Sequence, residues 1–429
     1  MATYATAANQ IAILQEYYPD NSLPHDLVYK KNPLLALIPK DESPSGFAGK
    51  YIPVPLTYGA PQGRSASFGN AQTNQTPPQV SSFFVYRVKN YQLVTIENEL
   101  LEATAHDVAT FIDEFKLAMD TGARNISNDL ALDLYQDGSG SRGVIASISG
   151  SGLITLTNSA QIVNFEDTMT LVSFSISGAT PTQSTGAALG YVIAVDRSNG
   201  TIQLSATPGG SAGLPTNWST SFPNLAVQGD VNFVANGLLT ANMQKISGLA
   251  AWLPKVAPSS SDSFWNVNRS TDVTRLAGVR FDGSSESIEE ALIDGSSLVA
   301  REGGQPDMCF MNFTSYASLE KSLGSKVQYV QVKHDEADIA FKGIVVNAPY
   351  GPITVIPDRN CSSQTAYLLQ MDMWKLRSLG KAPHILTYGA EGLEGLRVGN
   401  ADALEIRIAY YGNVINSAPG YNMQVALSA

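Results

Sequence analysis

The sequence predicts an α+β protein with a small all-β domain inserted near its middle. Three observations support this fold class. A long run of helical periodicity lies between His106 and Gln136, a Ser-, Thr- and Gly-rich stretch of short alternating runs follows it, and mixed helical and strand-like segments fill the second half. At 429 residues the chain exceeds what a single core usually supports, so we expect two or three domains, or one body with long projections.

The charge content of the chain is low and its balance is acidic. Charged residues make up 15% of the sequence, so much of the surface is uncharged, as in subunits that contact neighbouring copies. The formal charge of −11 argues against nucleic-acid recognition, which needs clustered Lys and Arg. Two cysteines, Cys309 and Cys361, are too few for a disulfide framework or a zinc site. The sequence has no signal-peptide pattern and no membrane-spanning run, so we expect no membrane association.

The first 96 residues contain little core-forming sequence. Residues 1–49 mix polar residues, short apolar patches and several prolines, and we interpret them as an arm that lies on another surface. Residues 50–96 place two β-rich flanks, YIPVPLTY and FFVYRVKNYQLVTIE, around a polar run, which predicts a long β-hairpin with a flexible tip. A tip this large is typical of a functional or mobile loop.

The helical run after the hairpin is amphipathic. We expect one helix from about His106 to Gln136, about 45 Å long at the standard rise per residue, with Gly122 as a tolerated weak point. A helix of this length would lie as a rod along a sheet or an interface. Its apolar positions are Val108, Phe111, Ile112, Phe115, Met119, Ile126, Leu130 and Leu134.

The composition changes after the helix. From about Gly138 to Asn236, short strand-like runs such as GYVIAVDRSNGTIQLSAT are separated by turns, and DRSNG between two strands predicts a hairpin. We interpret this region as an inserted small β-barrel or sandwich that serves display or contact.

Mixed sequence returns from about Gly237. Ser287 precedes Glu290 at the spacing of a helix capping box. PDMCFMNF then reads as a buried strand and TSYASLEKSLG as a helix that ends at Gly324. The chain closes with strand-like sequence, LEIRIAYYGNVINSAPGYNMQVAL, where most chains allow the terminus to fray.

Patterns that suggest an enzyme are each incomplete. Asp335 to Asp338 spell DEAD, but no phosphate-binding GxxxxGK[ST] accompanies them, and His334 beside these carboxylates fits a charged loop better than a metal site. The glycines between Gly389 and Asn400 lack the GxGxxG spacing of a dinucleotide site. The four histidines, His25, His106, His334 and His384, lie in different segments. We therefore predict no catalytic residues, no cofactor and no metal.

The order of arm, long hairpin, long helix, mixed domain and closing β segment resembles the tailed-bacteriophage major capsid protein of the HK97 fold. The segments that carry the resemblance are SIEEALIDGSSLVAREGGQPDMCFMNFTSYASLEKS and LEIRIAYYGNVINSAPGYNMQV. The resemblance implies the following division: N-terminal arm 1–49; E-loop hairpin 50–96; P-domain with spine helix 97–141; inserted β-domain 142–236; P-domain continued 237–284; A-domain 285–385; and P-domain C-terminal strands 386–429. It also implies that the closing strands lie beside the spine helix, with Asn413, Pro419 and Gly420 shaping the turn between them.

The resemblance implies self-assembly through pentamers and hexamers into the icosahedral head of a tailed double-stranded DNA phage, built in the host bacterial cytoplasm. Scaffolding, portal and decoration proteins would be partners, and the shell would enclose DNA without recognising its sequence. The hairpin would reach across a neighbouring subunit, which makes Arg64 and Phe68 at its tip the candidate intersubunit contact residues. Two alternatives remain: an encapsulin-type nanocompartment shell, and a β-rich surface binding or adhesin module.

The resemblance raises two questions about covalent processing. Some family members join subunits by a Lys-Asn isopeptide bond, but the only basic residue between Thr57 and Ser82 is Arg64, whose guanidinium cannot attack, so we predict no such bond. Because the hairpin begins near residue 50, we expect no cleaved scaffolding segment before it.

Overall fold

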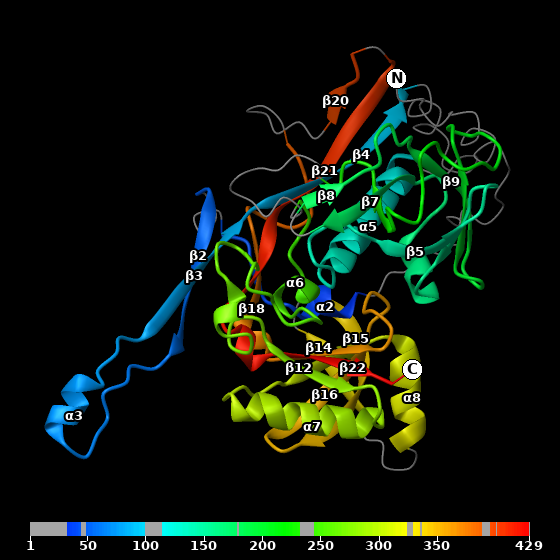
Figure 1. Ribbon diagram of the computed structural model, residues 1–429. Helices are drawn as coiled ribbons and strands as arrows, with labels where there is room; N and C mark the ends of the chain where they lie inside the picture. The colour runs from blue at the N-terminus through cyan, green and yellow to red at the C-terminus, as the bar shows by residue number, and fades with distance from the viewer. Residues whose placement is uncertain are drawn as a thin grey trace.

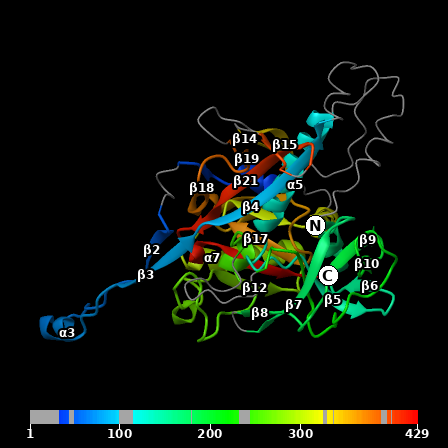
Figure 2. The same cartoon turned by 90° about the horizontal axis from the view of Figure 1, so that it is seen from above.

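The computed structural model describes residues 32–43, 49–98, 114–177, 180–231, 244–323, 329–334, 337–387, 395–399 and 401–428. Two sheets with their helices form the body, a β-barrel lies beside it, and the hairpin β2–β3 projects outward with helix α3 at its tip (Figures 1 and 2). Several expected features lie outside the described residues. They are most of the expected arm with His25, the helix start at His106, the DEAD carboxylates Asp335 and Glu336, and the glycines Gly389 and Gly392.

The first sheet is built around one long strand, β21 (Ala403–Asn416). Strand β4 (Val88–Glu97) pairs antiparallel with most of its length, from Ala403 opposite Glu97 to Gly412 opposite Val88. Four shorter strands complete this six-stranded sheet: β1 (Lys40–Asp41), β18 (Trp374–Ser378), β19 (His384–Ile385) and β20 (Gly395–Arg397).

The expected long helix is present as α5 (Glu114–Asp133), and it packs on β4 and β21. Ile126 and Leu130 of α5 and Leu134 just after its end are buried, as the helical spacing predicted, although the helix ends at Asp133 and not at Gln136. Gly122 is a close contact with the sheet: a Cβ built there would lie 2.5 Å from Cγ2 of Val94.

The second sheet has seven strands in the order β12-β22-β17-β13-β16-β15-β14. Helices α7 (Ile288–Arg301) and α8 (Phe313–Leu323) cover one face of it. The predicted capping box is confirmed, since Ser287 Oγ accepts from the N–H of Glu290 and Glu290 Oε2 accepts from the N–H of Ser287, each at 3.3 Å. The strands are β12 (Val279–Gly283), β13 (Met308–Met311), β14 (Tyr329–His334), β15 (Ala337–Ala348), β16 (Gly351–Pro357), β17 (Thr365–Leu369) and β22 (Met423–Leu427).

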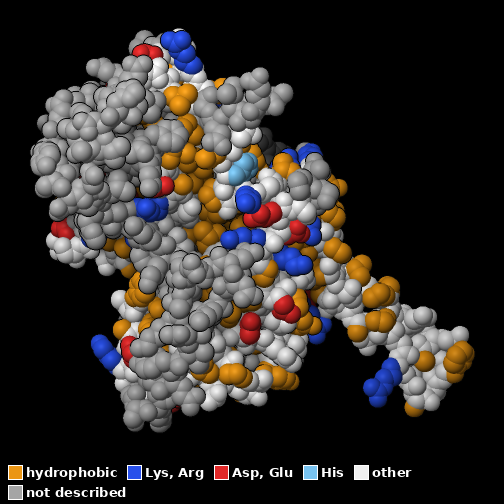
Figure 3. Space-filling model, turned by 180° about the vertical axis from the view of Figure 1, so that it is seen from behind, with side chains coloured by type: hydrophobic (Ala, Val, Ile, Leu, Met, Phe, Trp, Pro, Cys, Tyr) orange, Lys and Arg blue, Asp and Glu red, His pale blue; other side chains and the backbone are white. Residues whose placement is uncertain are grey.

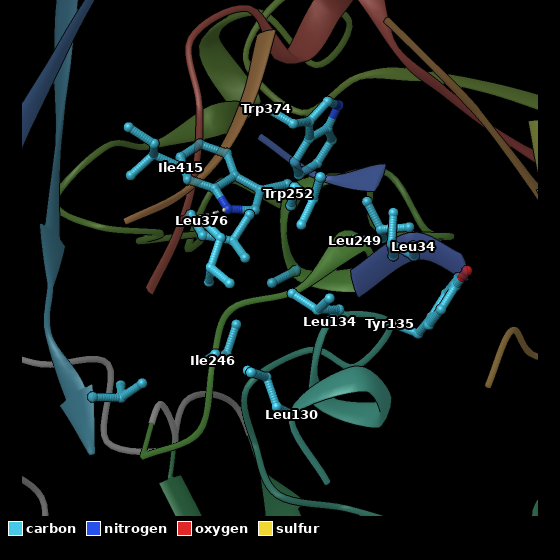
Figure 4. Close-up of a cluster of buried hydrophobic side chains, with 14 of the residues drawn as sticks. Leu34, Leu130, Leu134, Tyr135, Ile246, Leu249, Trp252, Trp374, Leu376 and Ile415 are labelled. Carbon is cyan, nitrogen blue, oxygen red and sulfur yellow. Dashed lines mark hydrogen bonds between the residues drawn. The ribbon is translucent and has the colours of Figure 1, made fainter. Parts of the chain in front are cut away.

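The central core joins the two sheets. On β13, Cys309 and Met311 face the helices while Phe310 faces the other way into this core, so the predicted buried strand is buried on both faces. Figure 4 shows part of the core, in which side chains from segments far apart in sequence meet around Trp252. The labelled residues are Leu34 of α2 (Pro33–Leu37), Leu130, Leu134, Tyr135, Ile246, Leu249 of α6 (Leu249–Trp252), Trp252, Trp374, Leu376 and Ile415.

The Ser-, Thr- and Gly-rich region forms a closed β-barrel. Closure follows because β11 pairs with both β5 and β7, and the apolar interior includes Phe165, Leu171 and Leu225, each fully buried. The predicted DRSNG turn joins β9 to β10. The strands are β5 (Gly143–Ile148), β6 (Leu153–Leu156), β7 (Thr170–Ser177), β8 (Thr180–Thr182), β9 (Gly190–Asp196), β10 (Thr201–Ser205) and β11 (Asn224–Val227).

The closing segment is paired within sheets, but its two strands belong to different sheets. β21 lies beside α5 as expected, whereas β22 pairs with β12 and β17 in the second sheet, so the expectation that both strands lie beside the helix is wrong. Pro419 and Gly420 form the turn between them. Asn413 is not in that turn: it lies within β21, where its side chain accepts from the N–H of Ser247 at 3.0 Å and donates to the carbonyl of Tyr86 at 2.8 Å.

Candidate assembly surface

The hairpin that projects from the body consists of β2 (Tyr51–Gly59) and β3 (Gln79–Tyr86), paired antiparallel. The second predicted flank is split, because the chain leaves the hairpin after Tyr86 and continues as β4 in the first sheet. Four of its side chains, Ile52, Val54, Phe83 and Val85, are buried in the central core and anchor its root.

Aromatic packing fixes the root of the hairpin. The ring of Phe83 lies 5.1 Å from that of Trp252 and 6.0 Å from that of Phe264, both edge to face. The N–H of Phe84 donates to the carbonyl of Trp265 at 3.0 Å. These contacts hold the direction in which the hairpin leaves the body.

The tip contrasts with the root, because it has no apolar core. The sequence predicted a flexible tip; the structure places a short helix there, α3 (Phe68–Thr73), which buries none of its residues. A six-residue helix is marginal on its own in water. Figure 3 shows the hairpin reaching away from the body with a nearly uncharged surface, and within residues 51–86 Arg64 is the only charged side chain.

Both candidate contact residues lie at this tip. Phe68 opens α3 with 79% of its side chain exposed, and Arg64 is exposed four residues earlier. The arrangement can bury one aromatic ring and one cation against a partner, and it offers no catalytic chemistry.

A second feature, which sequence reasoning missed, is a cluster of buried charges where the barrel joins α5. Lys245 Nζ lies 2.9 Å from Asp129, 3.2 Å from Asp230 and 3.7 Å from Asp133. Arg142 pairs with Asp129 and lies 3.7 Å from Asp230. We call this set the buried charge cluster; its members are Asp129, Asp133, Arg142, Asp230 and Lys245.

Burial and the charges of neighbouring groups raise the pKa of one carboxyl group in this cluster and lower that of another. Burial raises the pKa of Asp133 to about 7, with Asp129 and Asp230 adding to the rise and Lys245 opposing it. For Asp129, burial also acts to raise the pKa, but Arg142 and Lys245 outweigh it and the pKa is lowered. The pKa of Lys245 is raised by the surrounding carboxylates despite its burial.

The cluster ties together the elements that meet at the base of the barrel. Asp129 and Asp133 belong to α5, Arg142 precedes β5, and Asp230 follows β11. Neighbouring strands contribute too: Asn90 of β4 donates to Asp129 at 2.5 Å, and Tyr410 of β21 donates to Asp133 at 3.0 Å. The cluster therefore anchors both ends of the barrel, at Arg142 and Asp230, next to α5.

The barrel has a second attachment, on the loop that follows β16. Asn158 Nδ2 donates to Ser363 Oγ at 2.8 Å, and Arg359 donates to the carbonyl of Val163 at 2.6 Å. Two attachments on different parts of the body restrict the barrel's orientation. Within the described part of the chain, no group of three or more His, Cys, Asp or Glu side chains is placed to hold a metal ion, and no helix there is long and apolar enough to cross a membrane.

The comparisons with known proteins agree with this architecture. Residues 226–392 match the family model described as SU10 major capsid protein. The cyanophage A-1(L) capsid asymmetric unit has a similar fold, with a TM-score of 0.51 and 11% sequence identity over 92% of this chain and 92% of that chain. No curated protein matches the sequence significantly.

Two further solved structures are similar at lower scores. The capsid of the native GTA particle has a TM-score of 0.48 and 9% identity over 100% of each chain. The SrpI encapsulin of Synechococcus elongatus PCC 7942 has a TM-score of 0.45 and 7% identity over 99% of this chain and 96% of that chain.

Proposed function

We propose that this chain assembles through pentamers and hexamers into the icosahedral head of a tailed double-stranded DNA phage. The match to a capsid family model and the similar fold of a cyanophage capsid support this proposal. The observation that carries the proposal is the capsid-family match over residues 226–392. The role is structural rather than catalytic. Assembly would take place in the host bacterial cytoplasm, with scaffolding, portal and decoration proteins as partners.

Each part of the fold has a role in this proposal. In this proposal the first sheet with α5 forms the P-domain and α5 is its spine helix, the second sheet with α7 and α8 forms the A-domain, and the barrel is an inserted domain. This assignment departs from the division expected from the sequence, because β18 and β19 lie within residues 285–385 but belong to the first sheet, whereas β12 and β22 lie outside them but belong to the second. The hairpin β2–β3 is an E-loop that contacts a neighbouring copy through Arg64 and Phe68. A shell repeats each contact on every subunit, so a modest interface at the tip suffices once the shell closes.

The assembly state of the purified chain tests this proposal. Light scattering after size exclusion, with negative-stain images, should give megadalton particles, or pentamers and hexamers that close into shells when a scaffolding protein is added. A stable monomer of about the 45.7 kDa chain mass under all these conditions would contradict it. Nucleic acid inside the particles, rather than protein cargo, would separate a phage head from an encapsulin-type shell.

The two tip residues have a separate test. Phe68→Ala and Arg64→Gln should leave the thermal unfolding of the unassembled protein unchanged, because both side chains are exposed, and should lower the assembled fraction at least fivefold. Val256→Ala is the matched control, since Val256 is 77% exposed but lies on the body. If all three variants assemble like the unmodified chain, the tip is not an intersubunit contact.

A further inference from the structure

Strand β4 forms one edge of the first sheet. Its inner side pairs with β21, whereas β18, β19 and β20 pair with the opposite side of β21, as Figure 1 shows for β20. Among the described residues no strand pairs with the outer side of β4. An uncovered edge of ten residues is long, because natural proteins usually shorten or block such edges. The outer side of β4 is therefore a candidate for contact with another strand.

A hydrogen bond at the end of β4 shows which of its backbone groups point outward. In an antiparallel pair, residues that exchange hydrogen bonds alternate with residues whose N–H and C=O groups point away from the partner strand. The N–H of Asn98 donates to the carbonyl of Asp402 at 3.1 Å, and the register from Glu97 back to Val88 is unbroken. The even-numbered residues of β4 therefore bond to β21. The odd-numbered residues direct their backbone groups to the free edge; they are Lys89, Tyr91, Leu93, Thr95 and Glu97.

The side chains of the same five residues are exposed. They lie on the face of the sheet opposite buried Val94, with Leu93 51% exposed and Tyr91 45% exposed. Helix α5 leaves the edge free beside Leu93, because the atoms nearest to a Cβ built at Gly122 belong to Val94 of β4 and Ile408 of β21. The helix thus lies over both strands, and the edge of β4 is accessible and partly apolar.

Two outward backbone groups of β4 are bonded to side chains of the strand itself. The N–H of Tyr91 donates to Asn90 Oδ1 at 3.0 Å, and the carbonyl of Leu93 accepts from Gln92 Nε2 at 3.4 Å. Local bonds of this kind compete with sheet pairing and can be replaced by it. The outward N–H and C=O of Thr95 have no partner within the part of the chain that the structure describes.

We propose that two copies of this chain pair their β4 edges antiparallel, about a twofold axis at Leu93. The odd-numbered residues then face one another in hydrogen-bonded pairs. Leu93 lies opposite Leu93 of the second copy, Tyr91 lies opposite Thr95, and Lys89 lies opposite Glu97. Apolar, aromatic–β-branched and opposite-charge pairs across strands are those that stabilise sheets.

The charges of the edge favour a second copy over an unrelated strand. Lys89 and Glu97 have opposite charges and lie four residues to either side of Leu93. Neither side chain has an ion-pair partner among the described residues. Antiparallel self-pairing brings each of them against the other in the second copy, so one twofold contact forms two ion pairs.

This contact goes beyond the proposed function and does not depend on it. Rings of five or six copies are joined by heterologous contacts, whereas a twofold contact uses the same surface on both copies. In a shell, paired β4 edges would join two neighbouring rings. Without a shell, they would give a dimer.

Cysteine crosslinking tests the position of the axis. Cys309 and Cys361 are buried, so an introduced thiol on β4 is the accessible one. In Leu93→Cys the two Cα atoms would lie about 5.5 Å apart, within disulfide range, and diamide should give a dimer band on a non-reducing gel. Thr95→Cys is the matched control, because its two copies would lie four residues apart along the strands, about 14 Å, and should not crosslink. Equal crosslinking of both variants, or none of Leu93→Cys in associated protein, would overturn the proposal.

Charge exchange tests the register independently. Lys89→Glu places two carboxylates opposite each other at both ends of the pair, so the concentration at which half the chains associate should rise about tenfold. Sedimentation velocity measures this concentration. The double variant Lys89→Glu/Glu97→Lys restores both ion pairs and should associate nearly like the unmodified chain. Lys375→Glu is the control, since Lys375 is exposed on β18 of the same sheet. A double variant as weak as Lys89→Glu would contradict the register.

The outcomes separate this proposal from the capsid function. Shells in which Leu93→Cys does not crosslink would overturn the pairing of β4 edges and leave the capsid function standing. A crosslinked Leu93→Cys dimer from a chain that never forms shells would support the pairing and contradict the capsid function.

Discussion

Asp133 is a carboxyl group whose ionised form opposes the fold. Its side chain is buried beside Asp129 and Asp230, and its pKa is raised to about 7. With all five members ionised, the buried charge cluster has three carboxylates and two cations, a net charge of −1. Protonation of Asp133 makes the cluster neutral, so the site is most favourable when this carboxyl keeps its proton.

Asp133→Asn should therefore change stability in a pH-dependent way. The folded-state pKa lies above the ordinary value of 3.8, so the contribution of Asp133 to the free energy of unfolding falls as pH rises from about 4 to 7 and is constant above that. Relative to the unmodified chain, the variant should gain roughly 2 kcal/mol between pH 5 and pH 8. Urea unfolding of the unassembled protein measures this difference.

Asp120→Asn is the matched control, because Asp120 is exposed on the same helix. Its effect on the free energy of unfolding should be the same at pH 5 and pH 8. A difference between Asp133→Asn and the unmodified chain that stays constant from pH 5 to pH 8 would show that Asp133 is ionised throughout that range.

For individual residues, the sequence pattern indicates part of the buried charge cluster. Asp129 and Asp133 are spaced i, i+4 and alternate with Ile126, Leu130 and Leu134 on the apolar side of the helix, where unpaired carboxylates are costly. That spacing predicts buried cations nearby. It does not say which, because Arg142 and Lys245 are separated by the whole barrel and meet only through the fold.

Among the elements, α5 depends on Gly122 more than the sequence indicated. Helix propensity alone favours alanine over glycine by about 1 kcal/mol within a helix. A Cβ at Gly122, however, would lie 2.5 Å from Cγ2 of Val94 and 3.5 Å from Cδ1 of Ile408. Valine has little rotamer freedom with which to move away, so the close approach of helix and sheet requires the glycine.

Gly122→Ala should thus destabilise the fold by about 1–3 kcal/mol, the usual cost of overpacking. Adding Val94→Ala should recover part of the loss, since it removes the methyl group that collides. Gly69→Ala in α3 is the control, because nothing lies within 4 Å of a Cβ built there, and it should not destabilise. Thermal unfolding of the unassembled variants measures their relative stabilities. A Gly122→Ala variant as stable as the unmodified chain would contradict the close approach of helix and sheet.

Patterns of residues near in sequence predicted individual helices, strands and turns well, but they did not predict which strands pair with each other. The capping box at Ser287, the buried strand around Phe310 and the turn at Pro419 each rest on residues near in sequence, and each is confirmed. The pairing of β4 with β21, and of β22 with β12, joins strands far apart in sequence. Alternating apolar residues fix which face is buried, but they leave the choice of neighbouring strand open.

On the scale of the whole molecule, the barrel shares its anchoring charges with the body. Arg142 and Asp230 stand at its two connections, and a Cβ built at Gly140 would lie 2.8 Å from the carbonyl oxygen of Asp230, so the two connections run side by side. Removing residues 142–236 would therefore also remove one cation and one carboxylate from the buried charge cluster. Asp129 and Asp133 would then share Lys245 alone.

Two barrel deletions should accordingly differ in stability. Replacing residues 143–229 by a short Gly-Ser linker keeps Arg142 and Asp230 and should give a folded body. Deleting 142–236 should cost about 3 kcal/mol more, the lower end of the penalty for breaking a buried ion pair. Both variants lose the contacts to Arg359 and Ser363, so those losses cancel in the comparison. Equal urea midpoints would show that the cluster does not anchor the barrel, whereas shells formed by the linker variant would show that the barrel is dispensable for assembly.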